Sequence, residues 1–177
     1  GLARRTFVEN LKWACARDAR ASLTIEPMNR NDMPGYFLDS FELAAEIRAE
    51  PVIAEQLEAI RHCDLVLYSV GTVDEDSHIV RCGAVTVDEL ETLAAQGAIG
   101  VIAGQLIDAQ GQIVDCAYNR RLISADLGSI RSIPKRMMVV AEDHKFEALL
   151  AALRGGYVSH LVISAAMGRR LIEHWSA

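Results

Sequence analysis

Four residues beyond position 50 of the chain are suited to holding an anion. Gly71 and Thr72 come directly after an apolar run from Leu65 to Val70, where a buried strand is expected to end. Arg81 follows a short loop, and Lys145 opens a predicted helix. Backbone amides at such a strand end point outward, a guanidinium holds phosphate oxygens in a bidentate way, and an ammonium is a point cation. The sequence therefore predicts a crevice for phosphate or another anion beyond this strand.

Both cations also have an interpretation that needs no ligand. Arg81 lies close in sequence to the acidic run Asp74, Glu75 and Asp76, any of which could form an ion pair with it. Lys145 could simply be exposed to solvent, as most lysines are. The sequence leaves both alternatives open.

No residues form a pattern typical of catalysis or metal binding. There is no nucleophile elbow, phosphate loop or dinucleotide fingerprint, and the acidic run 74–76 is typical of a solvated turn. The histidines are dispersed without ligand spacing, at His62, His78, His144, His160 and His174. We expect no metal, no cofactor and no enzyme activity.

The composition limits the classes of partner. The chain has 177 residues, 51% of them hydrophobic, and a net charge of -6, which argues against a nucleic-acid surface. No apolar run is long enough to span a bilayer, and the first residues lack the apolar core of a signal peptide, so the cytoplasm is expected. The cysteines show no metal spacing and are interpreted as reduced core residues: Cys15, Cys63, Cys82 and Cys116. A small anionic ligand and a homo-oligomer are the partners that remain.

Helices alternate with apolar strands from residue 50 onward. Strands are expected at 65–70, 137–140 and 160–163, a longer apolar segment at 99–107, and helices after Thr86, after Lys145 and from Met167. Thr86-x-x-Glu89 has the form of a capping box. This order predicts a three-layer, Rossmann-like α/β fold with a mostly parallel sheet and helices on both faces. Ligands of such sheets bind beyond the carboxyl ends of the strands.

The segment before residue 50 repeats the alternation once. A helix is predicted at 4–20, a short strand at 23–25 ending at Glu26, and a second helix after residue 40. The break at Ala49-Glu50-Pro51 is the best internal boundary, which divides the chain into 1–49 and 50–177. The two parts are expected to pack as one globular domain, with 23–25 as a central strand.

From Glu50 the chain resembles the second half of the sugar-binding domain of SorC/DeoR-type bacterial transcriptional regulators. The resemblance rests on a strand ending in Val-Gly, an Arg-x-Gly, a Gly-Ala-x-Gly, an Asp-x-x-Gly turn and a Leu-Arg-Gly-Gly, all in order. It implies an effector domain that binds a phosphorylated sugar and changes the oligomeric state of a DNA-bound regulator. Lys145 matches the family's lysine after a Gly-Gly turn.

Several departures from that family weaken the sugar-phosphate interpretation. Ala141-Glu142 replaces the paired glycines before Lys145, and Val101 stands where the family usually has an acidic residue. The family's glycine- and threonine-rich phosphate loop and its DNA-reading helices have no counterpart in this sequence.

Residues 4–49 resemble a different family, the hydroxypyruvate isomerases, which are TIM barrels. The run from Glu26 through Pro27, with Asn29, Asp32 and Pro34-Gly35 after it, carries this resemblance. It covers one helix, one strand and the next helix of a barrel that needs eight such units. The resemblance implies a catalytic or metal-ligating role for Glu26, but its partner residues would come from missing strands.

Three hypotheses follow. The chain is a binding module with part of a sugar-phosphate pocket, a structural chimera without a ligand, or a residual isomerase. An engineered chimera of the two α/β folds is the leading explanation for the double resemblance.

Overall fold

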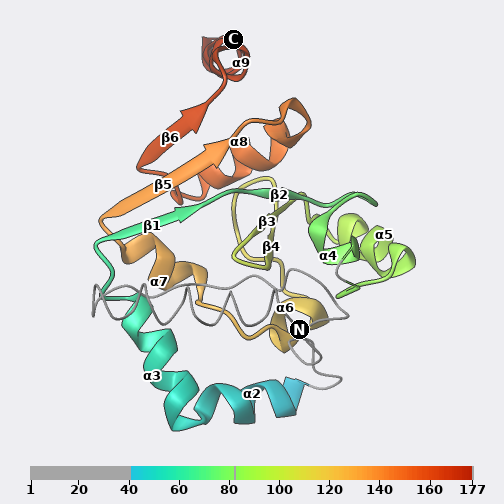
Figure 1. Cartoon of the computed structure of the whole chain (residues 1–177). Helices are drawn as coiled ribbons and strands as arrows, with labels where there is room; N and C mark the ends of the chain where they lie inside the picture. Colours follow the sequence, from blue (N-terminus) through green and yellow to red (C-terminus); the bar gives the residue numbers. More distant parts are fainter. Residues whose placement is uncertain (1–40, 82, 177) are drawn as a thin grey trace, which may run out of the picture.

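The computed structural model describes residues 41–81 and 83–176 (Figure 1). The predicted helix 4–20, the predicted strand 23–25 and Glu26 lie outside the described residues. The helices are α2 (Phe41–Ala49), α3 (Pro51–Ile60), α4 (His78–Arg81), α5 (Val87–Ala95), α6 (Ala117–Arg121), α7 (Leu127–Ser132), α8 (Phe146–Arg154) and α9 (Ala165–Ser176), with a 3-10 turn η1 (Asp143–Lys145). The strands are β1 (Leu65–Tyr68), β2 (Gly71–Thr72), β3 (Gly100–Ile102), β4 (Gln105–Ile107), β5 (Lys135–Val140) and β6 (His160–Ile163).

A parallel sheet of order β1-β5-β6 organises the described residues. Strand β5 is central, because Leu67 pairs with Met137 on one side and Val140 pairs with Ile163 on the other. Each crossover between these strands contains a helix, as parallel pairing requires. The α/β class with a parallel sheet is confirmed. The predicted strands 65–70 and 137–140 overlap β1 and β5 and differ from them by two residues at one end, and the predicted strand 160–163 coincides with β6.

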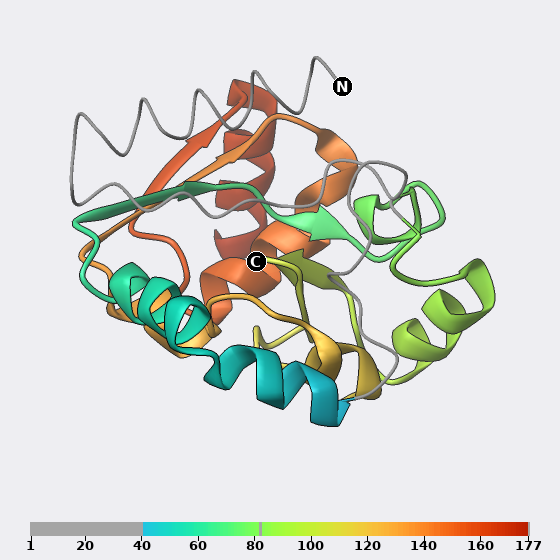
Figure 2. The same cartoon turned by 60° about the horizontal axis from the view of Figure 1, so that its bottom comes forward.

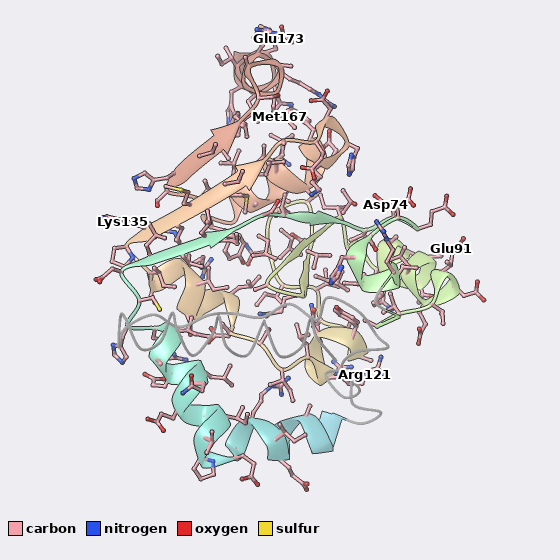
Figure 3. The ribbon with its side chains drawn as sticks, viewed as in Figure 1. Asp74, Glu91, Arg121, Lys135, Met167 and Glu173 are labelled. Carbon is pink, nitrogen blue, oxygen red and sulfur yellow. The ribbon has the colours of Figure 1, made fainter. Side chains whose placement is uncertain are left out.

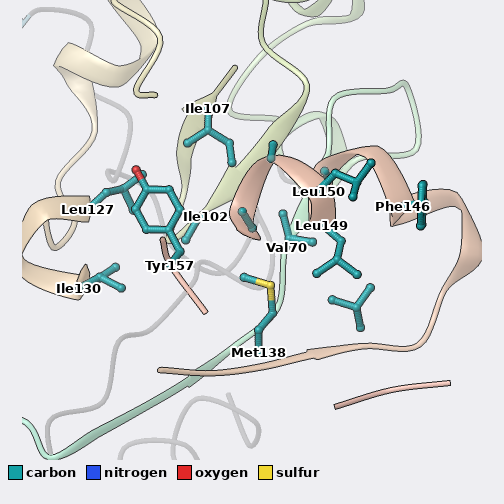
Figure 4. Packing of buried hydrophobic residues seen from close by; sticks show 14 of the residues in the cluster. Val70, Ile102, Ile107, Leu127, Ile130, Met138, Phe146, Leu149, Leu150 and Tyr157 are labelled. Carbon is teal, nitrogen blue, oxygen red and sulfur yellow. The ribbon is translucent and has the colours of Figure 1, made fainter. Parts of the chain in front are cut away.

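One face of this sheet packs against helices and carries the main core. Met138 and Val140 of β5 are fully buried against Leu149 and Leu150 of α8, as Figure 4 shows. Side chains alternate along each strand, so the next residues point to the other face. There Leu67 is 62% exposed, and its neighbours Leu65, Val139 and Val162 are exposed too. The described helices therefore account for one of the two helical layers predicted from the sequence.

The apolar segment 99–107 is two strands rather than one. Strands β3 and β4 form a hairpin, and β2 pairs antiparallel with β3 to complete a second sheet. The turn consists of Ala103 and Gly104, with φ of 48° and 81°. Positive φ at both positions is the geometry that two-residue hairpins favour. In Figure 2 this small sheet lies beside α8, which β3 contacts.

Local signals place most helix ends correctly. Thr86 and Glu89 form the predicted capping box at the start of α5, and Pro51 occupies the first turn of α3. Gly156 has a φ of 73° just beyond α8, where a left-handed residue ends the helix. The short helices α4, α6 and α7 were not predicted. No described helix is long and apolar enough to cross a bilayer.

Two glycines let the loop after β4 touch the end of α8. Gly111 has a φ of 75°, and a Cβ there would overlap the carbonyl oxygen of Ala151 and the Cα of Gly155. The buried Tyr157 hydroxyl donates a hydrogen bond to the Gly111 carbonyl at 2.9 Å. The Tyr68 hydroxyl in turn donates to the Tyr157 carbonyl, and burial raises the pKa of Tyr68 to about 12. The Asp-x-x-Gly motif (108–111) and the Leu-Arg-Gly-Gly motif (153–156) therefore pack against each other.

This contact generates a stability prediction. Gly111→Ala should lower the free energy of unfolding by about 3 kcal/mol or more, because the left-handed φ and the backbone overlap both penalise a Cβ. Gly156→Ala is the matched control: its φ of 73° is similar, but a Cβ there meets nothing within 4 Å. The control should lose only about 1 kcal/mol in urea unfolding. Equal losses for the two variants would refute the packing role.

Candidate functional site

The carboxyl edge of the parallel sheet brings two of the predicted site segments together. Strand β1 leads through the buried Val70 into β2, which carries Gly71 and Thr72, and β5 leads through 141–142 into η1. Strand β2 contacts η1, so Gly71-Thr72 lies beside the turn that ends at Lys145. Figure 3 shows the polarity of the sheet: Lys135 marks the amino end of β5, and Asp74 lies in the loop beyond β2.

Lys145 has a carboxylate partner. Its ammonium lies 2.9 Å from Glu142 Oε1, and its side chain is only 18% exposed. The other oxygen of Glu142 accepts a hydrogen bond from the Ala141 amide at 3.1 Å. The hydrogen bond from Lys145 is the main reason why the pKa of Glu142 is lowered. Lys145 is thus a largely buried, neutralised cation rather than the solvated surface lysine of the alternative interpretation.

Arg81 ends α4 and is exposed. Its backbone amide bonds to the Ser77 carbonyl at 3.0 Å, as part of the helical turn. Within residues 41–81 and 83–176, no ion pair joins its guanidinium to Asp74, Glu75 or Asp76, although the sequence allowed such a pair. No hydrogen bond between described residues links Arg81 to Thr72 or Lys145 either. The structure therefore shows no direct polar contact between Arg81 and the other predicted site residues.

The wall opposite Gly71 is apolar. Val101 of β3 pairs directly with Gly71 in the antiparallel sheet and is buried. A Cβ on Gly71 would come within 3.3 Å of the Val101 Cβ, which is a tight contact. The structure therefore places Val101 next to the candidate site, where it offers no hydrogen-bond acceptor to a sugar hydroxyl.

Arg170 of α9 is a further cation at this edge that the sequence analysis missed. Its guanidinium stacks 3.7 Å from the centroid of the Phe146 ring and donates to the Asp143 carbonyl at 3.3 Å. Asp143 is the first residue of η1, and Phe146 directly follows its last residue. The only sequence signal is the pair Arg169-Arg170, and nothing in the sequence shows that α9 returns to η1.

A separate polar cavity of about 360 Å³ lies between α2 and α3 on one side and the segment 119–126 on the other. Arg61 bridges Glu58 and Asp126, at 3.3 Å in each case. Arg48 donates to the carbonyl oxygens of Arg120 and Leu122. Helix α3 precedes β1 and α7 precedes β5, so this cavity is on the amino side of the sheet. No cluster of described residues could hold a metal ion.

Asn119 has a structural role at the edge of β4. Its side chain accepts a hydrogen bond from the Leu106 amide at 2.8 Å and donates to the carbonyls of Leu106 and Val114 at 3.0 and 2.8 Å. Leu106 is fully buried. The side chain thus replaces a missing backbone partner for β4, and it is not available to a ligand.

The described fold is an α/β domain built on a parallel sheet, an architecture in which ligands generally bind beyond the carboxyl ends of the strands. A family model described as "Putative sugar-binding domain" matches residues 20–173, so the chain belongs to this family of sugar-binding domains. The match begins within the segment that resembles the isomerases and crosses the boundary at residues 49 and 50. None of the relatives named below is an isomerase, and the chimeric origin stays a hypothesis.

The relatives are bacterial regulators. The chain is 28% identical over 135 residues to the uncharacterized transcriptional regulator YjhU of Escherichia coli K12, which covers 76% of this chain and 41% of the relative. It is 32% identical over 126 residues to the transcriptional regulator LsrR of Escherichia coli O139:H28, covering 70% and 40%. The chain thus spans less than half the length of these relatives. That they are regulators rather than enzymes agrees with the prediction that the chain is not an enzyme.

Solved structures confirm the fold. The sugar-binding domain of a transcriptional repressor from Vibrio fischeri superimposes with a TM-score of 0.73 at 25% identity, covering 80% of this chain and 57% of that one. The described parallel sheet with its helices is therefore the architecture of this family.

The structural role of Asn119 can be measured. Asn119→Ala should lower the free energy of unfolding by about 2 kcal/mol or more, because the buried Leu106 amide and the Val114 carbonyl lose the hydrogen bonds that the side chain makes with them. The neighbouring Arg120→Ala removes only an exposed ion pair to Asp115 and should cost about 1 kcal/mol or less. Urea unfolding of both variants tests this; an Asn119→Ala protein as stable as Arg120→Ala would contradict the assignment.

Proposed function

We propose that the chain is the effector-binding part of a SorC/DeoR-type transcriptional regulator and that it binds a sugar phosphate. One observation carries the proposal: in a member of a sugar-binding family, the strand-end residues Gly71-Thr72 lie beside the turn that carries Lys145. Two outward-facing backbone segments and a cation at one sheet edge suit a phosphate group. Such a domain would act in the cytoplasm, where regulators meet their DNA.

The phosphate would lie over the β2–η1 junction, with Lys145 as one cation. Arg81 is the second: its guanidinium is exposed and unpaired among the described residues, and a rotation of its long side chain can bring it over the crevice. Arg170 is held by Phe146 and the Asp143 carbonyl, so it contributes positive potential from a fixed place. The apolar Val101 favours recognition of the phosphate over recognition of the hydroxyls.

DNA recognition is assigned to another part of such a regulator. The relatives are more than twice as long as the matched segment, and the net charge of -6 gives this chain no basic surface for phosphate backbones. The effector domain would act on DNA only through its influence on the rest of the protein or on its assembly.

The role of Arg81 is testable by titration calorimetry with inorganic phosphate and glucose 6-phosphate. Arg81→Ala should weaken both by at least about 1.5 kcal/mol, roughly a tenfold rise in Kd, because a charge-assisted hydrogen bond is lost. Arg169→Ala removes another exposed arginine, also without a described partner, and should leave both affinities unchanged. Equal affinities for wild type and Arg81→Ala would leave Arg81 as an ordinary surface residue.

A further inference from the structure

The Glu142 carboxylate forms an ion pair with Lys145, the cation that a bound phosphate would contact. One of its oxygens lies 2.9 Å from Lys145 Nζ, and the other accepts the Ala141 amide at 3.1 Å. One ammonium and one backbone amide are also the kind of donors that hold a phosphate oxygen. In the structure, therefore, a side chain of the protein provides the negative charge at this turn.

We propose that Glu142 determines the charge specificity of the strand-end site: it is an internal anion that an effector must displace from Lys145. The inference rests on the proposed function of that site. A neutral sugar leaves the Glu142–Lys145 pair intact and gains nothing from Lys145. A phosphate dianion has more charge and more acceptor oxygens than the carboxylate, so it can compete for the ammonium.

The exposure of the two partners makes this displacement feasible. The Lys145 side chain is 18% exposed and stays in place, whereas the Glu142 side chain is 49% exposed and can rotate into water without being desolvated. Ion pairs with one solvated partner stabilise a protein by about 1 kcal/mol or less, so the competition costs an effector no more than about fivefold in affinity. Lys145 lies in η1 and Glu142 directly precedes this turn; because η1 contacts the Gly71-Thr72 strand, the pair adjoins the other half of the site.

The inference also predicts discrimination by charge. An anion with a single charge competes with the Glu142 carboxylate on equal terms, whereas a dianion has the stronger attraction for Lys145. We therefore expect the chain to discriminate against anions with a single charge.

The test is calorimetric titration of wild type and Glu142→Gln with inorganic phosphate, glucose 6-phosphate and glucose. Glutamine keeps the size and an acceptor oxygen but removes the charge, so both phosphates should bind about fivefold more tightly to the variant, while glucose is unaffected. Glu147→Gln is the matched control: it removes one negative charge from an exposed residue of α8, close in sequence, and should behave as wild type.

The outcomes distinguish this inference from the proposed function. If wild type and Glu142→Gln bind glucose 6-phosphate equally well, or if Glu147→Gln tightens binding as much, the role of Glu142 is refuted and the site stands. If neither protein binds either phosphate, the proposed function fails and the inference fails with it. Tighter binding of inorganic phosphate alone, with unchanged binding of glucose 6-phosphate, would likewise refute the role of Glu142 toward an effector.

Discussion

The parallel pairing of β5 with both of its neighbours is the constraint on which the rest of the structure depends. Because β1, β5 and β6 run in the same direction, their carboxyl ends meet at one edge. The chain leaves that edge at Gly71-Thr72 after β1 and at η1 after β5, and this is why β2 and η1 lie in contact. Substitutions that shift this register would separate the two segments.

The sequence predicted the parts of the fold that depend on local pattern. Apolar runs identified β1, β5 and β6, and the Thr86–Glu89 capping box identified the start of α5. It did not predict the β3–β4 hairpin, because an unbroken apolar run conceals a turn made by only Ala103 and Gly104. Short helices such as α6 also escaped, since fewer than two turns show no clear helical period.

The site was predictable only in outline. The sequence pattern predicts Gly71-Thr72 at a strand end and Lys145 at the start of a helix, but the contact between β2 and η1 depends on pairings between distant segments. Glu142, the partner of Lys145, is only three residues away in the sequence. The sequence analysis identified position 142 as one that lacks glycine, but it did not predict the ion pair. Arg170 could not be found at all, because its place on Phe146 is set by the packing of α9 on α8.

The motifs that carry the family resemblance have mainly structural roles here. Gly111 and Gly155 allow one backbone contact between two of these motifs. Val101 and Glu142, by contrast, lie beside the candidate site, as the partners of Gly71 and Lys145.

The most direct measurement of the central claim is a map of backbone amide chemical shifts during titration with glucose 6-phosphate. The account predicts that the largest changes cluster at residues 71–72 and 141–145, on the carboxyl edge of the sheet. Changes centred on the polar cavity around Arg61 and Asp126, on the amino side, would contradict it. A titration that changes no amide at either place would contradict it equally.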